Sequence, residues 1–167
     1  MLMHGARLEA VARSVGVNAA RTAVTAVVSL LAATAFRLPQ AYWAPITALV
    51  ITQSSLGSAL PVSRDRLVGT AVGAVVGALA GNWFAPSAWV FGISIFVLGL
   101  LCAVTRTDRS AYRFAGMTLA IVLLTPRVAP VWRIAVNRFV EVAIGIAVAL
   151  LMTVAWPERD APAAGKV

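Results

Sequence analysis

The chain has 167 residues, of which 60% are hydrophobic and 12% are charged, and its formal net charge is +8. A soluble domain is about half apolar and a quarter charged, so this composition is typical of an integral membrane protein. A membrane span needs about 20 apolar residues, and six spans would leave only short loops. We therefore expect one all-α domain, a polytopic membrane helical bundle, with no room for a soluble enzyme.

The positive charge comes almost entirely from arginine, since Lys166 is the single lysine. A strongly basic chain can bind nucleic acid, but these arginines flank apolar runs instead of forming one patch. Cationic loop ends are what membrane orientation requires, so the expected partner is the lipid bilayer and not nucleic acid. Cys102 and His4 are the only residues of their types. We therefore expect no internal disulfide, no metal site and no cofactor.

The chain opens with an amphipathic segment at residues 1–17, in which apolar residues recur at helical spacing. We expect this segment to lie on the cytoplasmic membrane surface, and a frayed tail is the alternative. The first span follows at residues 18–36. One face of this span should contact protein or a water-filled path, through interhelical hydrogen bonds or substrate contacts. That polar face consists of Asn18, Thr22, Thr25 and Ser29.

Five further spans follow the first, separated by short connections. They are predicted at residues 42–56, 67–83, 87–105, 112–126 and 139–156. A charged turn is expected from Pro61 to Arg66, before the third span, and a basic loop from Arg106 to Arg113, before the fifth. Residues 157–167 follow the helix-stopping Pro157 and are expected to form a disordered cytoplasmic tail.

The third span carries four glycines with a spacing of four residues, which places them on one helix face. They are Gly69, Gly73, Gly77 and Gly81. In water each glycine would cost a helix about 0.5–1 kcal/mol relative to alanine. In a bilayer the backbone must satisfy its own hydrogen bonds, so the helix is enforced and the small residues permit close helix packing. We expect this face to pack against the first or the sixth span.

The distribution of arginine predicts the orientation of the bundle. With six spans and the N-terminus inside, ten of the 14 basic residues fall in cytoplasmic segments. The four that fall outside are Arg37, Arg127, Arg133 and Arg138. Because basic residues favour the cytoplasmic side, both termini are expected in the cytoplasm.

A weak internal repeat relates the two halves of the chain. Arg66 precedes Gly73 by seven residues, and Arg138 precedes Gly145 by the same interval. Tyr42 and Tyr112, which open the second span of each half, are separated by nearly the same offset as the two arginines. With three spans in each half, a duplication would give a 3+3 inverted repeat, as in many transporters. Chance similarity between apolar helices is the alternative.

The short second and fifth spans occupy corresponding positions in these halves. Short or interrupted spans in such positions indicate a binding site near the middle of the membrane. The polar groups they offer are Thr47, Thr52, Gln53, Ser54, Thr118 and Thr125.

Three motifs resemble the fusaric acid resistance family, a group that includes aromatic acid exporters. The motifs are Tyr42-Trp43-Ala44-Pro45 continuing to Gln53-Ser54-Ser55, Arg66-x-x-Gly69-Thr70-x-x-Gly73, and Arg138-x-x-Glu141-x-x-x-Gly145. The resemblance covers most of residues 18–156. It implies a six-span inner-membrane unit linked to efflux of aromatic or other organic acids. Larger members resemble two such units with soluble domains, so one unit alone implies a homo-oligomer.

Arg66 and Arg138 are the candidate binding residues for an organic anion, at opposite mouths of the predicted repeat. Interfacial anchoring is the alternative role for these arginines. Glu141 is the one acidic residue near a span interior, three residues after Arg138. A carboxylate in a span costs about 2.5–3.5 kcal/mol on insertion scales, which favours a functional role. That role is either proton coupling or an ion pair that closes the end of the sixth span.

Two functions remain open at this point. The first is a secondary transporter that exports organic acids, with Thr47, Gln53, Thr118, Arg66, Arg138 and Glu141 as its substrate-binding residues. The second is a non-transporting membrane scaffold or accessory subunit. A buried polar path would favour the first, and a dry interior packed with glycine and alanine would favour the second.

Overall fold

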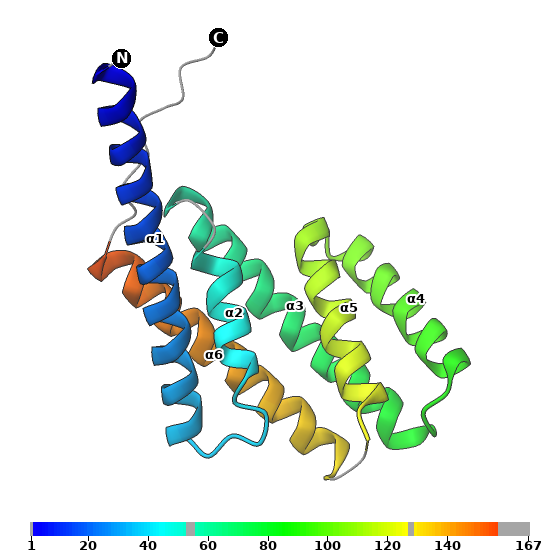
Figure 1. Ribbon diagram of the computed structural model, residues 1–167. Coiled ribbons are helices and arrows are strands. Elements are labelled where there is room, and N and C mark those ends of the chain that lie inside the picture. Colours follow the sequence, from blue (N-terminus) through cyan, green and yellow to red (C-terminus); the bar gives the residue numbers. More distant parts are fainter. Residues whose placement is uncertain (1, 53–55, 127–128, 157–167) are drawn as a thin grey trace.

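The described part of the chain is all-helical and contains six helices (Figure 1). The computed structural model describes residues 2–52, 56–126 and 129–156, with side chains from residue 12 onward except at 56 and 58. The helices are α1 (Leu2–Ala35), α2 (Trp43–Thr52), α3 (Leu56–Trp83), α4 (Ala88–Val104), α5 (Arg109–Leu124) and α6 (Val131–Ala155). The predicted tail at 157–167 and the candidate residues Gln53 and Ser54 lie outside the described residues.

Helix α1 is one continuous helix of 34 residues, where the sequence predicted a surface segment at 1–17 and a separate span. Its first turns project beyond the rest of the bundle (Figure 1). Because no proline interrupts this stretch, the helix continues through the predicted boundary once it has nucleated.

Helices α3 and α6 begin earlier than predicted. The segment from Pro61 to Arg66, predicted as a charged turn, is helical and belongs to α3. Helix α6 begins at Val131, eight residues before the predicted start of the sixth span. In α3 the early residues Ala59 and Val62 pack against an apolar cluster on α2 and α6, which stabilises the helix despite its proline. Both arginines of the predicted repeat therefore lie within helices.

Helices α1 and α4 end in the same way. After α1, the amide of Leu38 donates to Ala33 and the amide of Arg37 donates to Thr34. After α4, Thr107 and Arg106 make the corresponding bonds to Cys102 and Ala103. These are Schellman caps with an arginine in the left-handed position, at φ 52° for Arg37 and 51° for Arg106.

Helices α3 and α6 run side by side through the centre of the bundle, with α1 and α2 on one side and α4 and α5 on the other (Figure 1). Helix α3 packs mainly on α5, and α6 packs on α2 and α3 to nearly the same extent. Helix α1 contacts α2 and α6, while α4 contacts α5 and α3. Exchanging the first three helices with the last three leaves this pattern of neighbours unchanged.

The glycine face of α3 packs mainly on α5, so the predicted contact with the first or sixth span is wrong for most of its length. A Cβ atom on Gly69 would overlap the carbonyl oxygen of Ala111, and one on Gly73 would overlap that of Ala115. Further along, Gly77 faces Val122 on α5, and only Gly81 faces α6, at its first residue Val131. Gly145 on α6 makes the equivalent contact with the Ala44 carbonyl of α2. Spacing identified the face, but only the fold decided which helix covers it.

The polar face of α1 turns inward, as predicted. Thr25 and Ser29 are fully buried. The threonine hydroxyls of Thr22 and Thr25 donate to carbonyls one turn earlier in α1 itself, so they do not make the interhelical bonds considered above. Arg21 ties this helix to two others, because it donates to the carbonyls of Thr52 and Trp156 at the C-terminal ends of α2 and α6.

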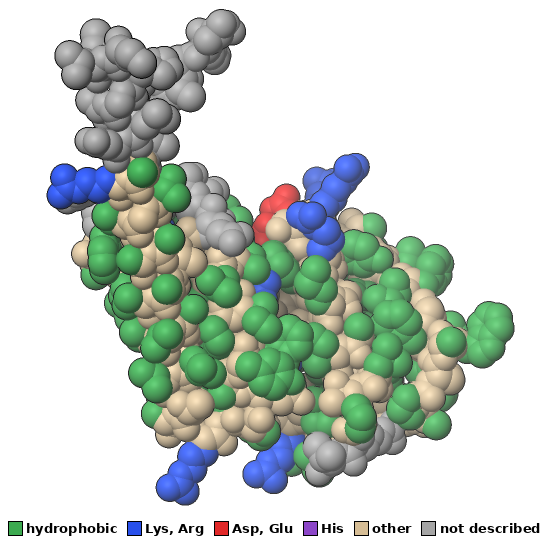
Figure 2. Space-filling view, viewed as in Figure 1, with side chains coloured by type: hydrophobic (Ala, Val, Ile, Leu, Met, Phe, Trp, Pro, Cys, Tyr) green, Lys and Arg blue, Asp and Glu red, His purple; other side chains and the backbone are tan. Residues whose placement is uncertain are grey.

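The outer surface is largely apolar. Figure 2 shows hydrophobic side chains over the middle of one face and basic side chains toward its two ends. Trp89, Val104 and Val154 are 83%, 82% and 81% exposed. Soluble monomers rarely expose so much apolar surface, and a bilayer would cover it. Among the described residues, Ala12–Ala35 and α6 are each long and apolar enough to cross a membrane.

Candidate functional site

The buried polar centre of the bundle contains two arginines, one on each of the two central helices. Arg66 on α3 is 8% exposed and Arg138 on α6 is 3% exposed. Each arginine is carried to the interior by its own helix, because about three turns of α3 precede Arg66 and about two turns of α6 precede Arg138. The sequence prediction that they lie at opposite mouths is therefore wrong.

Arg66 is held by a hydroxyl group and an aromatic ring. Its Nε and Nη2 atoms donate to Thr47 Oγ1 on α2, at 3.2 and 3.0 Å. Its guanidinium carbon lies 4.8 Å from the ring centre of Phe114 on α5, a cation–π distance. Within the described residues no carboxylate forms an ion pair with Arg66. A buried cation with only neutral partners is poorly compensated for its lost hydration.

Arg138 is held by an ion pair and a closer aromatic contact. Its Nη1 lies 3.2 Å from Glu141 Oε2, one helical turn further along α6. The other oxygen of Glu141 accepts the backbone amide of Gln40 at 3.1 Å, which joins α6 to the connection before α2. The guanidinium carbon lies 3.5 Å from the ring centre of Trp43 on α2. Arg138 is therefore fixed more tightly than Arg66.

Both arginines line one small internal cavity of about 30 Å³. Its remaining lining comes from α2, α3, α5 and α6. Those residues are Trp43, Thr70, Phe114, Met117, Thr118, Ile121 and Val142. A water needs about 10–15 Å³ of such space, so the cavity is large enough for one or two waters or a small ionic group.

A second cavity of about 50 Å³ lies on the other side of Arg138. It is lined by Pro39, Gln40, Thr125, Ala129, Ile134, Asn137, Arg138 and Glu141. The two cavities share Arg138, and the second one reaches Pro39 and Gln40 in the connection between α1 and α2. Polar groups thus follow one another from that connection to the centre, but the cavities themselves are small.

The structure brings five of the six predicted binding residues together. Thr47 and Thr118 join the two arginines and Glu141 at the centre, and the sixth, Gln53, lies outside the described residues. Sequence reasoning did not identify the two rings, Trp43 and Phe114, as partners of the arginines. The interval between these rings nearly equals the interval between the arginines, which could have revealed them. Aromatic residues near span ends are, however, usually interfacial anchors.

Charge at this centre is unbalanced. Two arginines and one glutamate give a net charge of +1 among its described residues. Two donors, Arg138 Nε and Trp43 Nε1, are buried without an acceptor among the described residues. The centre therefore lacks negative charge and lacks acceptors.

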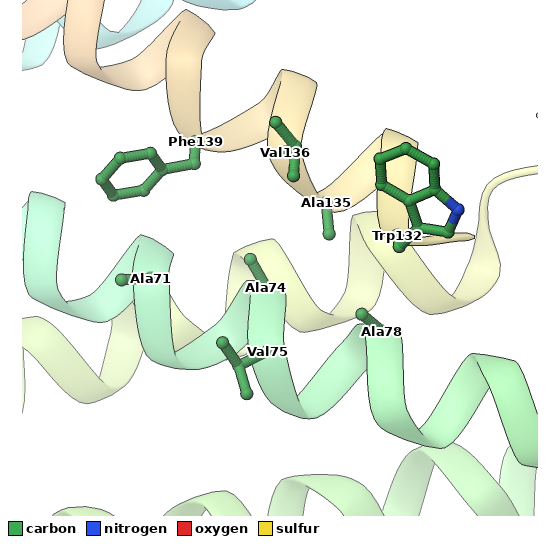
Figure 3. A pocket seen from close by; sticks show the side chains of 8 residues that line it. All are labelled: Ala71, Ala74, Val75, Ala78, Trp132, Ala135, Val136 and Phe139. Atoms are coloured by element: carbon green, nitrogen blue, oxygen red, sulfur yellow. The ribbon is translucent and has the colours of Figure 1, made fainter. Parts of the chain in front are cut away.

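A larger hollow of about 380 Å³ lies between α3 and α6 at the outer surface (Figure 3). Its lining is apolar and consists of Ala71, Ala74, Val75, Ala78, Trp132, Ala135, Val136 and Phe139. Figure 3 shows the alanines of α3 opposite the aromatic side chains of α6. This hollow has the chemistry of a surface covered by hydrocarbon and offers no group that would recognise an anion.

Comparison with known families places the three sequence motifs within one family. The family model described as fusaric acid resistance protein-like matches residues 23–152, a range that reaches all six helices and contains both arginines. The chain belongs to this family. The resemblance seen in the sequence is thus confirmed, and the apolar outer surface is that of an integral membrane member.

Several curated proteins resemble this fusaric acid resistance-like chain. It is 28% identical over 151 residues to "Uncharacterized transporter YdhK" of Escherichia coli (strain K12), covering 85% of this chain and 22% of the relative. It is 27% identical over 150 residues to "Inner membrane protein YeeA" of the same organism, covering 86% and 41%. The chain therefore spans between a fifth and two fifths of the length of these relatives. No solved structure matches it.

Proposed function

We propose that this protein is an inner-membrane transporter unit that exports aromatic or other organic acids. The observation that carries the proposal is Arg66, a cation that is 8% exposed and whose described partners are a hydroxyl and a ring. Charged groups inside a membrane domain are costly and mark substrate or ion pathways. An organic anion would supply the charge that the centre lacks. The names of the relatives, which include a transporter and an inner membrane protein, agree with this role.

The proposed topology has six spans and both termini in the cytoplasm. Helix α2 has 10 residues, about 15 Å of helix, and α4 and α5 have 17 and 16. Such helices are shorter than a hydrocarbon core of about 30 Å, so they would cross it together with their connecting residues. Short second spans in both halves are typical of transporters with a site near the middle of the membrane.

The proposed 3+3 inverted repeat is supported by equivalent contacts at the centre. Arg66 on the third helix lies over Phe114, and Arg138 on the sixth lies over Trp43. In each case the ring belongs to the second helix of the other half. The contacts of Gly73 with Ala115 and of Gly145 with Ala44 follow the same exchange. Each residue and its counterpart in the other half are separated by nearly the same interval along the chain.

Transport of an anion is tested by efflux from proteoliposomes that contain the purified full chain. We expect benzoate efflux that depends on the pH gradient and exceeds that of empty vesicles. Arg66→Gln keeps a hydrogen-bonding group for Thr47 but removes the charge, so we expect at least a tenfold loss of rate. Arg109→Gln, an exposed change at the start of α5, is the matched control and should retain the rate. Unchanged efflux by folded Arg66→Gln would contradict the proposal.

Proton coupling through Glu141 is the second part of this proposal. Glu141 is 1% exposed and lines the second cavity, and its ion-pair partner Arg138 lines both cavities. Protonation of Glu141 would weaken its ion pair with Arg138 and raise the net charge of the centre from +1 to +2, so the hold on a bound anion would follow the pH gradient. Glu141→Gln should therefore export without dependence on the pH gradient. If Glu141→Gln still exports with the same dependence on the pH gradient as the wild type, Glu141 does not couple protons and its ion pair is only structural.

A membrane scaffold is the second candidate function, and the tight interior favours it. The glycine contacts of α3 and α6 leave no space for an added methyl group, and the central cavity measures only about 30 Å³. An aromatic acid would need the helices to separate before it could pass. Folded protein that moves none of a panel of aromatic acids at either of two pH gradients would favour the scaffold.

A homo-oligomer is expected for either function, and light scattering of the purified protein tests it.

A further inference from the structure

The central cavity has a defined net charge, and that charge limits which anions it accepts. Around it, Arg66 and Arg138 contribute two positive charges, and Glu141 contributes one negative charge. One monovalent anion would bring the sum to zero. A divalent anion would leave one uncompensated negative charge in a buried site, which is strongly unfavourable.

The polar groups that lack a partner determine what the anion must offer. Arg138 Nε and Trp43 Nε1 are both donors without an acceptor among the described residues, and both residues line the cavity. An indole nitrogen is a donor only, and so is a guanidinium group. The ligand must therefore present acceptor atoms, as a carboxylate does with its two oxygens.

The volume determines how much of the anion enters. A cavity of about 30 Å³ admits a carboxylate group but not an aromatic ring. The ring would remain outside the cavity, where Met117 of α5 borders it with a side chain that is 58% exposed.

We infer that the centre between α2, α3, α5 and α6 is a subsite for the carboxylate of monovalent organic acids. In this subsite Glu141 sets the charge selectivity through the net charge of +1, and the indole N–H of Trp43 donates to one carboxylate oxygen. This inference rests on the proposed function for its biological setting, but binding tests it without transport.

Wild-type protein alone provides the first test. Isothermal titration of the full chain in detergent micelles compares benzoate, phthalate with both carboxyl groups ionised, and uncharged benzamide. We expect benzoate to bind at least tenfold more tightly than either of the other two, because only benzoate neutralises the centre. Equal binding of all three, or no benzoate binding, would overturn the inference.

Glu141→Gln provides the second test, since it removes the negative charge and keeps an oxygen for the Gln40 amide. With a centre of charge +2, phthalate should gain at least tenfold relative to benzoate. An unchanged ratio between the two acids in the folded variant would overturn the charge selectivity. If Glu141 had only a structural role, Glu141→Gln would weaken the binding of both acids equally, and the ratio of their affinities would not change.

Trp43→Phe tests the indole donor, since phenylalanine retains a ring for Arg138 and lacks the N–H. Loss of one charge-assisted hydrogen bond should weaken benzoate binding about tenfold. Trp89→Phe makes the same change at a side chain that is 83% exposed and should have no effect. Equal affinities of the Trp43→Phe and wild-type proteins would overturn this donor role.

The two proposals fail separately. Benzoate export without any discrimination by charge would overturn the subsite and leave the proposed transport function standing. Selective benzoate binding by a protein that exports no acid would support the subsite and contradict transport.

Discussion

The charged residues at the centre of the bundle can be identified from the sequence, but most of their contact partners cannot. Arg66, Arg138 and Glu141 are identifiable from the sequence because charges inside apolar runs are rare and expensive. Their partners are not, because Arg66 contacts Thr47 and Phe114 from two other helices. An Arg–Glu pair one turn apart is a local interaction, and it was the part of the site that sequence spacing predicted correctly.

Arg106 provides a stability prediction at this scale. Its φ of 51° lies in the left-handed region, which glycine adopts without the steric cost that a Cβ atom brings. Arg106→Gly should therefore stabilise the protein by about 0.5–1 kcal/mol. Thermal unfolding in detergent measures the effect. Arg113→Gly, inside α5, should have the opposite sign, because glycine weakens a helix interior; destabilisation by both changes would contradict the interpretation of the cap.

Whole helices follow the sequence in their number and diverge in their extent. The start of α4 was predicted within a residue, because Ser87 caps it by accepting the amide of Val90 at 3.2 Å. The starts of α3 and α6 were predicted too late. At both sites a charged or proline-containing stretch is typical of a loop, but its apolar residues pack into the core and continue the helix.

Gly73→Ala tests the contact between α3 and α5. An added Cβ atom would overlap the backbone carbonyl of Ala115, and a backbone has little room to move. Overpacking of this kind costs about 1–3 kcal/mol, so we expect a clear fall in the unfolding temperature. Gly92→Ala on α4 has nothing within 4 Å and is the matched control, which should be neutral or slightly stabilising. Similar unfolding temperatures for both variants would contradict the close packing of α3 on α5.

At the scale of the whole molecule, the apolar surface and the ends rich in arginine indicate how the bundle sits in the membrane. The exposed side chains around the middle are large and apolar, and basic residues lie toward the ends (Figure 2). Helices α1 and α4 both end in a cap with an arginine in the left-handed position. The proposed inverted repeat puts these two helix ends on opposite sides of the membrane.

Thiol labelling tests that topology. In a Cys102→Ser background, Arg37→Cys should react with a membrane-impermeant thiol reagent added outside intact cells. Arg106→Cys should react only after the membrane is permeabilised. Both positions are exposed in turns, so accessibility differs only through their side of the membrane. Labelling of both from outside, or of Arg106→Cys alone, would contradict the proposed orientation.

The sequence by itself determined the class of this protein, its helical character and its family. These follow from composition and from motifs within single helices, so each residue carries the information locally. It also identified the charged groups of the candidate site, since a charge in an apolar run stands out without any partner.

Only the tertiary structure decided which surfaces meet. The glycines of α3 could accept any helix that approaches closely, and in the folded chain most of them face α5. The packing of α3 beside α6 brings Arg66 and Arg138 to one cavity, because each helix begins two to three turns before its arginine. Contacts between residues on different helices depend on the geometry of the whole chain, and spacing along a single helix carries no information about them.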